Sequence, residues 1–255
     1  MTNEMLDALV SRADRSGVFL DFDGTLSEIA QVPTAAKAVP GAAEALSRLA
    51  ERFRVVAVVS GRMASEVKRR LGSPRGVRFF GLYGAEGPHP IGDRSEDHYS
   101  RVVEEILPRV LELAAAVPGS LVEPKGWNIA VHYRLSPDPE VAHSELLEGL
   151  APLARGVGLT IIEGKRVVEL VPSGAPTKGD LVAREGEGLE GILFAGDDLA
   201  DVEAFAAVDR LAETGAHAVK VAVRSAETPP ELIQAADMTV DGPADLVRIL
   251  EALSA

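Results

Sequence analysis

The chain has 255 residues, of which 46% are hydrophobic, so it can build a core in one large domain or two smaller ones. Its formal net charge of −13 and the lack of a basic arm or stripe argue against a nucleic-acid partner, because a polyanion would be repelled. There is no cysteine, which excludes thiol catalysis, disulfides and cysteine-ligated zinc.

The amino-terminal stretch, residues 1–17, has scattered acidic residues and no long apolar centre. We therefore expect an amphipathic helix there and not a signal peptide. No apolar run reaches the roughly 18 residues that a membrane-spanning helix requires. These features predict a soluble, cytoplasmic protein without a membrane partner, and we expect a monomer.

Short apolar runs without alternation predict strands that are covered on both faces, as in a parallel sheet. These runs are residues 18–22, 55–60, 77–82, 192–196, 219–223 and 238–240. Helical patterns between the runs are found at residues 42–50, 64–71, 178–184, 199–207 and 244–253. The alternation of strand and helix predicts an α/β fold in which a doubly wound domain surrounds a parallel sheet.

Residues 83–172 follow a different pattern, which opens with a loop rich in glycine and proline. The predicted elements after that loop are a helix at 96–117, strands at 120–124 and 127–134, a helix at 139–153, and strands at 158–164 and 166–172. We expect these elements to form an α+β cap domain over 83–172. The cap would be inserted into a core domain that comprises residues 1–82 and 173–255.

The first chemically informative motif is LDFDGTL, in which Asp21 and Asp23 flank Phe22 at the end of a predicted strand. Because side chains alternate along a strand, the two acids should project to one side. Ligands of α/β sheets bind at this carboxyl end of the strands, and Gly24 permits a sharp exit of the chain. Taken alone, the motif is also compatible with an acidic turn. A calcium loop fits less well, because its glycine stands at the sixth position.

A second acidic cluster follows another predicted strand, where Gly196 precedes Asp197 and Asp198, and Asp201 lies at the start of a helix. Two acid clusters at strand ends of one parallel sheet predict a site of hard oxygen ligands suited to Mg²⁺. Capping of the helix amino terminus is the alternative. It explains Asp201 well, but it does not explain both clusters together.

Two further motifs supply groups that bind anions. In VVSGR, Ser60 and Gly61 follow a buried strand, where a hydroxyl and backbone amides at a helix start can hold a phosphate. In PTKGD, Lys178 lies in the first turn of a predicted helix, where a cation opposes the helix dipole and so indicates a bound anion. Taken singly, a helix cap for Ser60 and a solvated surface position for Lys178 are the simpler explanations.

Together, LDFDGTL, VVSGR, PTKGD and FAGDDLAD resemble, in this order, the motifs of the haloacid dehalogenase (HAD) superfamily of aspartate-nucleophile phosphatases. The insert resembles the type 2B cap of that superfamily. Within the superfamily, GLYGAEG, EPKGWNIAVHYR and GDDLADVEAF are similar to the trehalose-6-phosphate phosphatases. The resemblance implies a HAD-like Rossmannoid core, Mg²⁺ as cofactor, and hydrolysis of trehalose 6-phosphate through an aspartyl-phosphate.

The resemblance also implies roles for individual residues. Asp21 would be the nucleophile, and Asp23 would serve as general acid and then as general base. The implied catalytic set is Asp21, Asp23, Ser60 and Lys178. The implied Mg²⁺ ligands are Asp21, Asp23 through its main-chain carbonyl, Asp197 and Asp198.

Residues that select the small phosphorylated sugar would come mostly from the cap. The substrate-binding candidates that the resemblance implies are Gly61, Arg62, Glu86, Lys125, His132, Arg134 and Glu169. Strand alternation places Asn128, His132 and Arg134 on one face, although a solvated sheet face is the simpler explanation for Asn128 and Arg134 singly. Tyr83 departs from the family pattern, which more often has histidine there.

Three classes of function stay open at this point. The first is a phosphatase for trehalose 6-phosphate. The second keeps the chemistry but acts on sucrose 6-phosphate, a glycosyl-phosphoglycerate or a hexose phosphate, or is a phosphomutase, because fold and catalytic motifs do not set specificity. The third is a non-catalytic phosphosugar-binding module, against which the retention of every catalytic residue argues.

Overall fold

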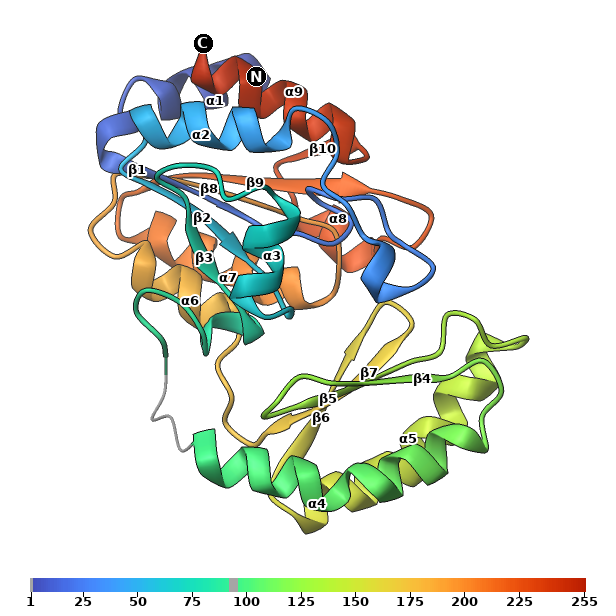
Figure 1. Ribbon diagram of the computed structural model, residues 1–255. Coiled ribbons are helices and arrows are strands. Elements are labelled where there is room, and N and C mark those ends of the chain that lie inside the picture. The colour runs from blue at the N-terminus through green and yellow to red at the C-terminus, as the bar shows by residue number, and fades with distance from the viewer. Residues whose placement is uncertain (1, 92–95) are drawn as a thin grey trace. The chain divides into compact units, whose positions relative to one another are not determined.

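The computed structural model describes residues 2–91 and 96–255. The chain divides into two compact units, which we call the core unit (Met1–Ile91 and Pro176–Ala255) and the cap unit (Gly92–Ala175). The cap unit therefore interrupts the core unit in the sequence, as the colours of Figure 1 show. Among the described residues, no helix combines the length and the apolar character needed to cross a membrane.

A six-stranded sheet forms the centre of the core unit. Its strands are β1 (Ser16–Leu20), β2 (Val55–Val59), β3 (Arg78–Phe80), β8 (Gly191–Gly196), β9 (His217–Arg224) and β10 (Met238–Asp241). They lie in the order β10-β9-β8-β1-β2-β3, and all five neighbouring pairs are parallel. The chain runs outward from β1 in one direction and from β8 in the other. The topological switch point, where α/β sheets bind ligands, is thus between β1 and β8.

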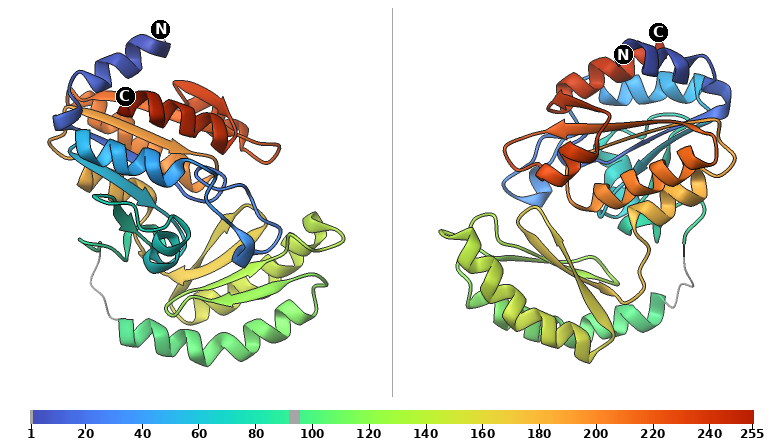
Figure 2. Two further views of the ribbon diagram at one scale, coloured as in Figure 1. Left: turned by 45° about the horizontal axis from the view of Figure 1, so that its top comes forward. Right: turned by 180° about the vertical axis from the view of Figure 1, so that it is seen from behind.

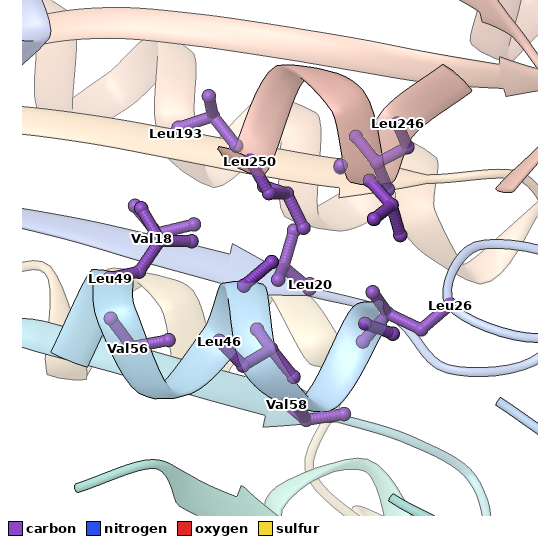
Figure 3. Packing of buried hydrophobic residues seen from close by; sticks show 14 of the residues in the cluster. Val18, Leu20, Leu26, Leu46, Leu49, Val56, Val58, Leu193, Leu246 and Leu250 are labelled. Atoms are coloured by element: carbon purple, nitrogen blue, oxygen red, sulfur yellow. The ribbon is translucent and has the colours of Figure 1, made fainter. Parts of the chain in front are cut away.

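Helices cover both faces of this sheet (Figures 1 and 2). The helices of the core unit are α1 (Thr2–Val10), α2 (Ala42–Arg52), α3 (Ala64–Arg70), α6 (Lys178–Glu185), α7 (Ala200–Glu213), α8 (Pro230–Ala235) and α9 (Pro243–Ser254). Val18 and Leu20 of β1 pack in one cluster with residues of α2 and α9 (Figure 3), whereas Phe19 packs in a second cluster with residues of α6 and α7. Burial on both faces explains why the strands read as continuous apolar runs.

The described part of the cap unit is an antiparallel sheet with two helices. Its elements are α4 (Glu96–Ala115), β4 (Leu121–Pro124), β5 (Ile129–His132), α5 (Pro139–Gly156), β6 (Leu159–Gly164) and β7 (Val167–Pro172), and the sheet order is β4-β5-β7-β6. Val168 and Leu170 of β7 pack in one cluster with residues of both helices. Because side chains alternate, Glu169 and its strand partner Ala130 face the opposite side of the sheet.

The predicted α/β fold, with a parallel core sheet and a separate α+β unit, is confirmed. Several element bounds differ from the prediction, and two of the differences bear on the site. Strand β1 ends at Leu20 and not at residue 22, because the Phe22 carbonyl accepts bonds from the amides of Leu26 and Ser27 and so closes a turn. Residues 83–91 belong to the core unit, in which the Tyr83 amide donates to the Ser60 carbonyl. The structural division thus lies further along the chain than the predicted boundary at 83.

Candidate active site

The motif around Asp21 is built on a tight turn that follows β1. The Asp21 amide continues the sheet by donating to the Ala195 carbonyl of β8 at 2.9 Å. Gly24 has a φ of 78°, and a Cβ added there would lie 2.0 Å from Asp197 Oδ2. Only glycine allows the backbone to come this close to Asp197, which explains the glycine in the motif. Thr25, which the sequence reasoning did not single out, donates its hydroxyl to Asp197 Oδ1 at 3.1 Å.

Lys178 connects the acids at the ends of β1 and β8. Its Nζ lies 2.8 Å from Asp21 Oδ1, 2.7 Å from Asp201 Oδ1 and 3.8 Å from Asp198 Oδ1. The Lys178 side chain is only 2% exposed, so it is no surface lysine. A capping box between Thr177 and Asp180 starts helix α6 at Lys178. The fixed start of the helix explains how a long, flexible side chain is held in this cluster.

Asp201 organises the loop that follows β8. Its Oδ2 accepts the amides of Asp197 and Asp198 at 2.9 and 3.0 Å, while its Oδ1 is bound to Lys178. Asp198 turns outward, with a side chain that is 24% exposed, and its Oδ1 accepts the amide of Ala200. Asp198 thus binds the first amide of helix α7, whereas Asp201 lies inside the cluster and orients the loop.

Burial and neighbouring negative charges together raise the pKa values of the acids in this cluster. Burial raises the pKa of Asp21 to about 8, with Lys178 lowering it and Asp197 and Asp198 raising it further. Burial also raises the pKa of Asp201 well above its usual value. Burial alone would lower the pKa of Lys178, but Asp201 and Asp21 outweigh this and raise it well above its usual value. Ionising these acids together would place more negative charge in the site than one lysine balances, so a bound cation would favour their ionised forms.

The residues present fit a divalent metal ion. Within the described part of the chain, Asp21, Asp197 and Asp201 each offer a carboxylate oxygen, and these atoms lie within 4.8 Å of one another. Buried carboxylate oxygens without histidine or sulfur are the donor set of a hard cation. Asp198, one of the predicted ligands, is not in this close group. Asp201 already binds one lysine and two amides, which leaves Asp21 and Asp197 as the better-placed ligands.

The Ser60 loop lies at the carboxyl end of β2, next to β1. The Ser60 amide donates to the Phe80 carbonyl at 3.0 Å, and Ser60 Oγ accepts the amide of Arg62 at 3.2 Å. A Cβ on Gly61 would lie 2.7 Å from the hydroxyl of Tyr83, so a larger residue there would force the Tyr83 side chain to move. Arg62 contacts Asp23 and Glu66 through its guanidinium. Ser60 and Gly61 thus end the strand next to the one that carries Asp21.

The remaining sequence candidates have partners within their own units. Glu86 accepts the amide of Ala64 at 2.8 Å and so caps α3. In the cap unit, Lys125 Nζ lies 2.9 Å from Glu169 Oε1, and Asn128 Nδ2 donates to Glu169 Oε2 at 3.2 Å. The other two candidates have partners apart from this cluster, where His132 contacts Glu123 and Arg134 donates to the Lys165 carbonyl.

The Lys125–Asn128–Glu169 cluster is buried and incompletely satisfied. Lys125, Asn128 and Glu169 are 9%, 1% and 4% exposed. Asn128 Oδ1 has no hydrogen-bond partner among the described residues. Because an orphaned buried acceptor is unfavourable, the cluster suits a ligand that donates a hydrogen bond.

Comparisons with known proteins show which family the chain resembles. A sequence model of the family described as "Trehalose-phosphatase" matches residues 19–241. A trehalose-phosphate phosphatase of Mycobacterium avium (strain 104) is 35% identical over 213 residues, covering 79% of this chain and 53% of the relative. One of Mycobacterium tuberculosis (strain ATCC 25618 / H37Rv) is 32% identical over 264 residues, covering 98% of this chain and 63% of the relative.

A solved structure has the same fold. The C-terminal domain of the C. albicans trehalose-6-phosphate phosphatase superposes with a TM-score of 0.82 at 20% identity. The superposition covers 100% of this chain and 97% of that chain. The chain spans between about half and two thirds of the length of the two mycobacterial relatives.

Proposed function

Because the chain belongs to the trehalose-phosphatase family, we propose that it hydrolyses trehalose 6-phosphate to trehalose and inorganic phosphate. The observation that carries the proposal is the buried contact of Lys178 with Asp21 at the topological switch point, with Asp197 at the end of the neighbouring strand. This arrangement pairs a nucleophilic carboxylate with the positive charge that a phosphate dianion needs in order to approach it.

The reaction would proceed in two steps on the chain's own residues. In the first step, an Asp21 oxygen forms a bond to phosphorus, the bond from phosphorus to the sugar oxygen breaks, and Asp23 gives that oxygen a proton. In the second step, Asp23 takes a proton from water, the water oxygen bonds to phosphorus, and Asp21 is released. Ser60 and the amides beside Gly61 would hold the phosphoryl oxygens meanwhile.

We propose that this site binds Mg²⁺, which Asp21, Asp197 and the main-chain carbonyl of Asp23 would hold, with Asp198 nearby. When bound, the ion supplies positive charge that offsets repulsion between the carboxylate and the phosphate. The supporting observation is the buried group of carboxylate oxygens with a single lysine. A requirement for Mg²⁺ is tested by assaying the protein in EDTA and then adding Mg²⁺, Mn²⁺ or Ca²⁺ back separately.

The cap unit would recognise the sugar. The buried Lys125–Asn128–Glu169 cluster offers both charges and an unpaired acceptor, which suits a group rich in hydroxyls. His132 stays a candidate for the same role. Glu86 and Arg134 have structural partners, a helix cap and a backbone carbonyl, so we expect them to act on the substrate only indirectly. The cytoplasmic location and the monomeric state stay predictions.

The test is phosphate release from a panel of substrates with Mg²⁺ present. The panel contains trehalose 6-phosphate, sucrose 6-phosphate, glucose 6-phosphate and a glycosyl-phosphoglycerate. We expect a kcat/KM for trehalose 6-phosphate at least about 100-fold above the others, because a polar sugar pocket rejects ligands that leave its groups unpaired. Equal turnover of all four would refute the trehalose assignment. Preference for one of the others would identify the second class of function.

A further inference from the structure

The two acids of the first motif have different cationic partners. Lys178 contacts Asp21, whereas Asp23 is bound by Arg62. Arg62 Nε donates to Asp23 Oδ2 at 2.6 Å, and Nη2 donates to Asp23 Oδ1 at 2.9 Å. A pair of bonds from one guanidinium fixes the plane of a carboxylate as well as its distance, which the single ammonium of a lysine does not do.

Arg62 is more deeply buried than its partner Asp23, and this difference bears on the role of each residue. The Arg62 side chain is 10% exposed, whereas the Asp23 side chain is 39% exposed. Arg62 also donates from Nη1 to Glu66 at 2.7 Å, so all three of its guanidinium nitrogens are bound to protein carboxylates. A buried guanidinium engaged in this way is poorly placed to bind a ligand that arrives from solvent. Its carboxylate partner remains accessible to one.

A second ion pair, between Glu66 and Arg70, fixes the position of Glu66, which is the other carboxylate partner of Arg62. Glu66 Oε1 accepts from Arg70 Nε and Nη2 at 2.9 and 2.6 Å, one turn further along α3. Arg70 Nη1 in turn donates to the carbonyls of Thr34 and Ala36, in the segment that follows the first motif. The chain of contacts from Arg70 through Glu66 to Arg62 therefore ties the position of Asp23 to helix α3 and to that segment.

We infer that Arg62 is a positioning residue for Asp23, which it holds in the orientation for proton transfer, and that it is not the substrate-binding residue suggested by its motif. This inference rests on the proposed phosphatase function, because it assigns Asp23 the transfer of a proton to the departing oxygen. Proton transfer depends on a heavy-atom separation near hydrogen-bond length, so a carboxylate that rotates freely transfers a proton less efficiently.

The test compares two leaving groups. Departure of a sugar alkoxide needs a proton, whereas departure of 2,4-dinitrophenolate does not. For Asp23→Asn we expect kcat/KM to fall by about 10²- to 10⁴-fold with trehalose 6-phosphate and much less with 2,4-dinitrophenyl phosphate. Arg62→Gln should reproduce this selective loss at about 10- to 100-fold. Arg62→Lys should recover part of it, because a lysine keeps the charge but not the paired bonds.

Matched controls separate positioning from general damage. Glu66→Gln, which does not touch Asp23, should give a smaller loss that is also confined to the sugar phosphate. Arg78→Gln removes another arginine–glutamate pair of the core unit, Arg78–Glu185 at 2.9 Å. This variant should leave kcat/KM unchanged for both substrates. An equal loss for both substrates in Arg62→Gln, expressed mainly as a higher KM, would overturn the inference and assign Arg62 to phosphate binding.

A measurement without catalysis keeps the inference independent of the proposed function. Urea unfolding of the wild type, Asp23→Asn, Arg62→Gln and the double variant gives the coupling between the two side chains. We expect a coupling of about fivefold or more in the unfolding equilibrium constant, and additive effects would overturn the contact. If the wild type hydrolyses neither phosphate ester while this coupling is present, the proposed function fails and the Arg62–Asp23 contact stands.

Discussion

The core unit and the cap unit place their buried charges differently. In the core unit, helices cover both faces of the sheet, and Asp21 and Asp197 lie just beyond the strand ends. In the cap unit, α4 and α5 pack against one face, and the buried Glu169 lies on the other face. A site at strand ends is fixed by topology, whereas a site on a sheet face depends on single side chains. We therefore assign chemistry to the core unit and substrate choice to the cap unit.

The largest effect should come from Asp21→Asn. Removing the nucleophile should lower kcat by at least about 10⁴-fold for every phosphate ester, because no other group can form the covalent intermediate. The change keeps the size of the side chain, so the fold should persist. Phosphate release measures the loss, and circular dichroism checks the fold. Retention of more than about a tenth of the activity would refute the assigned nucleophile.

Gly24→Ala should destabilise the core unit. The new Cβ would lie 2.0 Å from Asp197 Oδ2, in addition to the unfavourable φ of 78°. We expect a loss of about 2–4 kcal/mol in the free energy of unfolding, measured by urea denaturation. Gly188→Ala is the matched control, since its φ is 74° but nothing lies within 4 Å. That variant should lose only about 1 kcal/mol. Equal losses would show that the contact with Asp197 is unimportant.

A smaller effect should appear in the pH dependence of stability without metal. In the folded protein burial raises the pKa of Asp21 from 3.8 to about 8. Its contribution to stability is therefore fully present below about pH 4 and is lost as the pH rises to 8. In EDTA, Asp21→Asn should gain a few degrees in Tm over the wild type at pH 8 and almost none at pH 4. A gain that is the same at both pH values would contradict this reading of the cluster.

Much of the site follows from the sequence because it depends on topology. Acids that follow two apolar runs in a parallel sheet meet when the runs become neighbours, as β1 and β8 do. The features of the site that residue spacing does not predict depend on local geometry. Asp198 binds the amide of Ala200, and Asp201 is the acid that lies in the close group with Asp21 and Asp197. The ion pair of Arg62 with Asp23 joins residues that are 39 positions apart in the sequence. It depends on the rotamers of both side chains, which the periodicity of the sequence does not predict.

The division of labour between the two units is tested most directly by Glu169→Gln, assayed on trehalose 6-phosphate and on 2,4-dinitrophenyl phosphate. The change removes the charge that Lys125 faces at 2.9 Å without altering the core unit. We predict that kcat/KM falls about 10- to 100-fold for trehalose 6-phosphate and stays within about twofold for the aryl phosphate, because only the sugar loses its buried partner. An equal fall for both substrates would contradict the assignment of substrate choice to the cap unit.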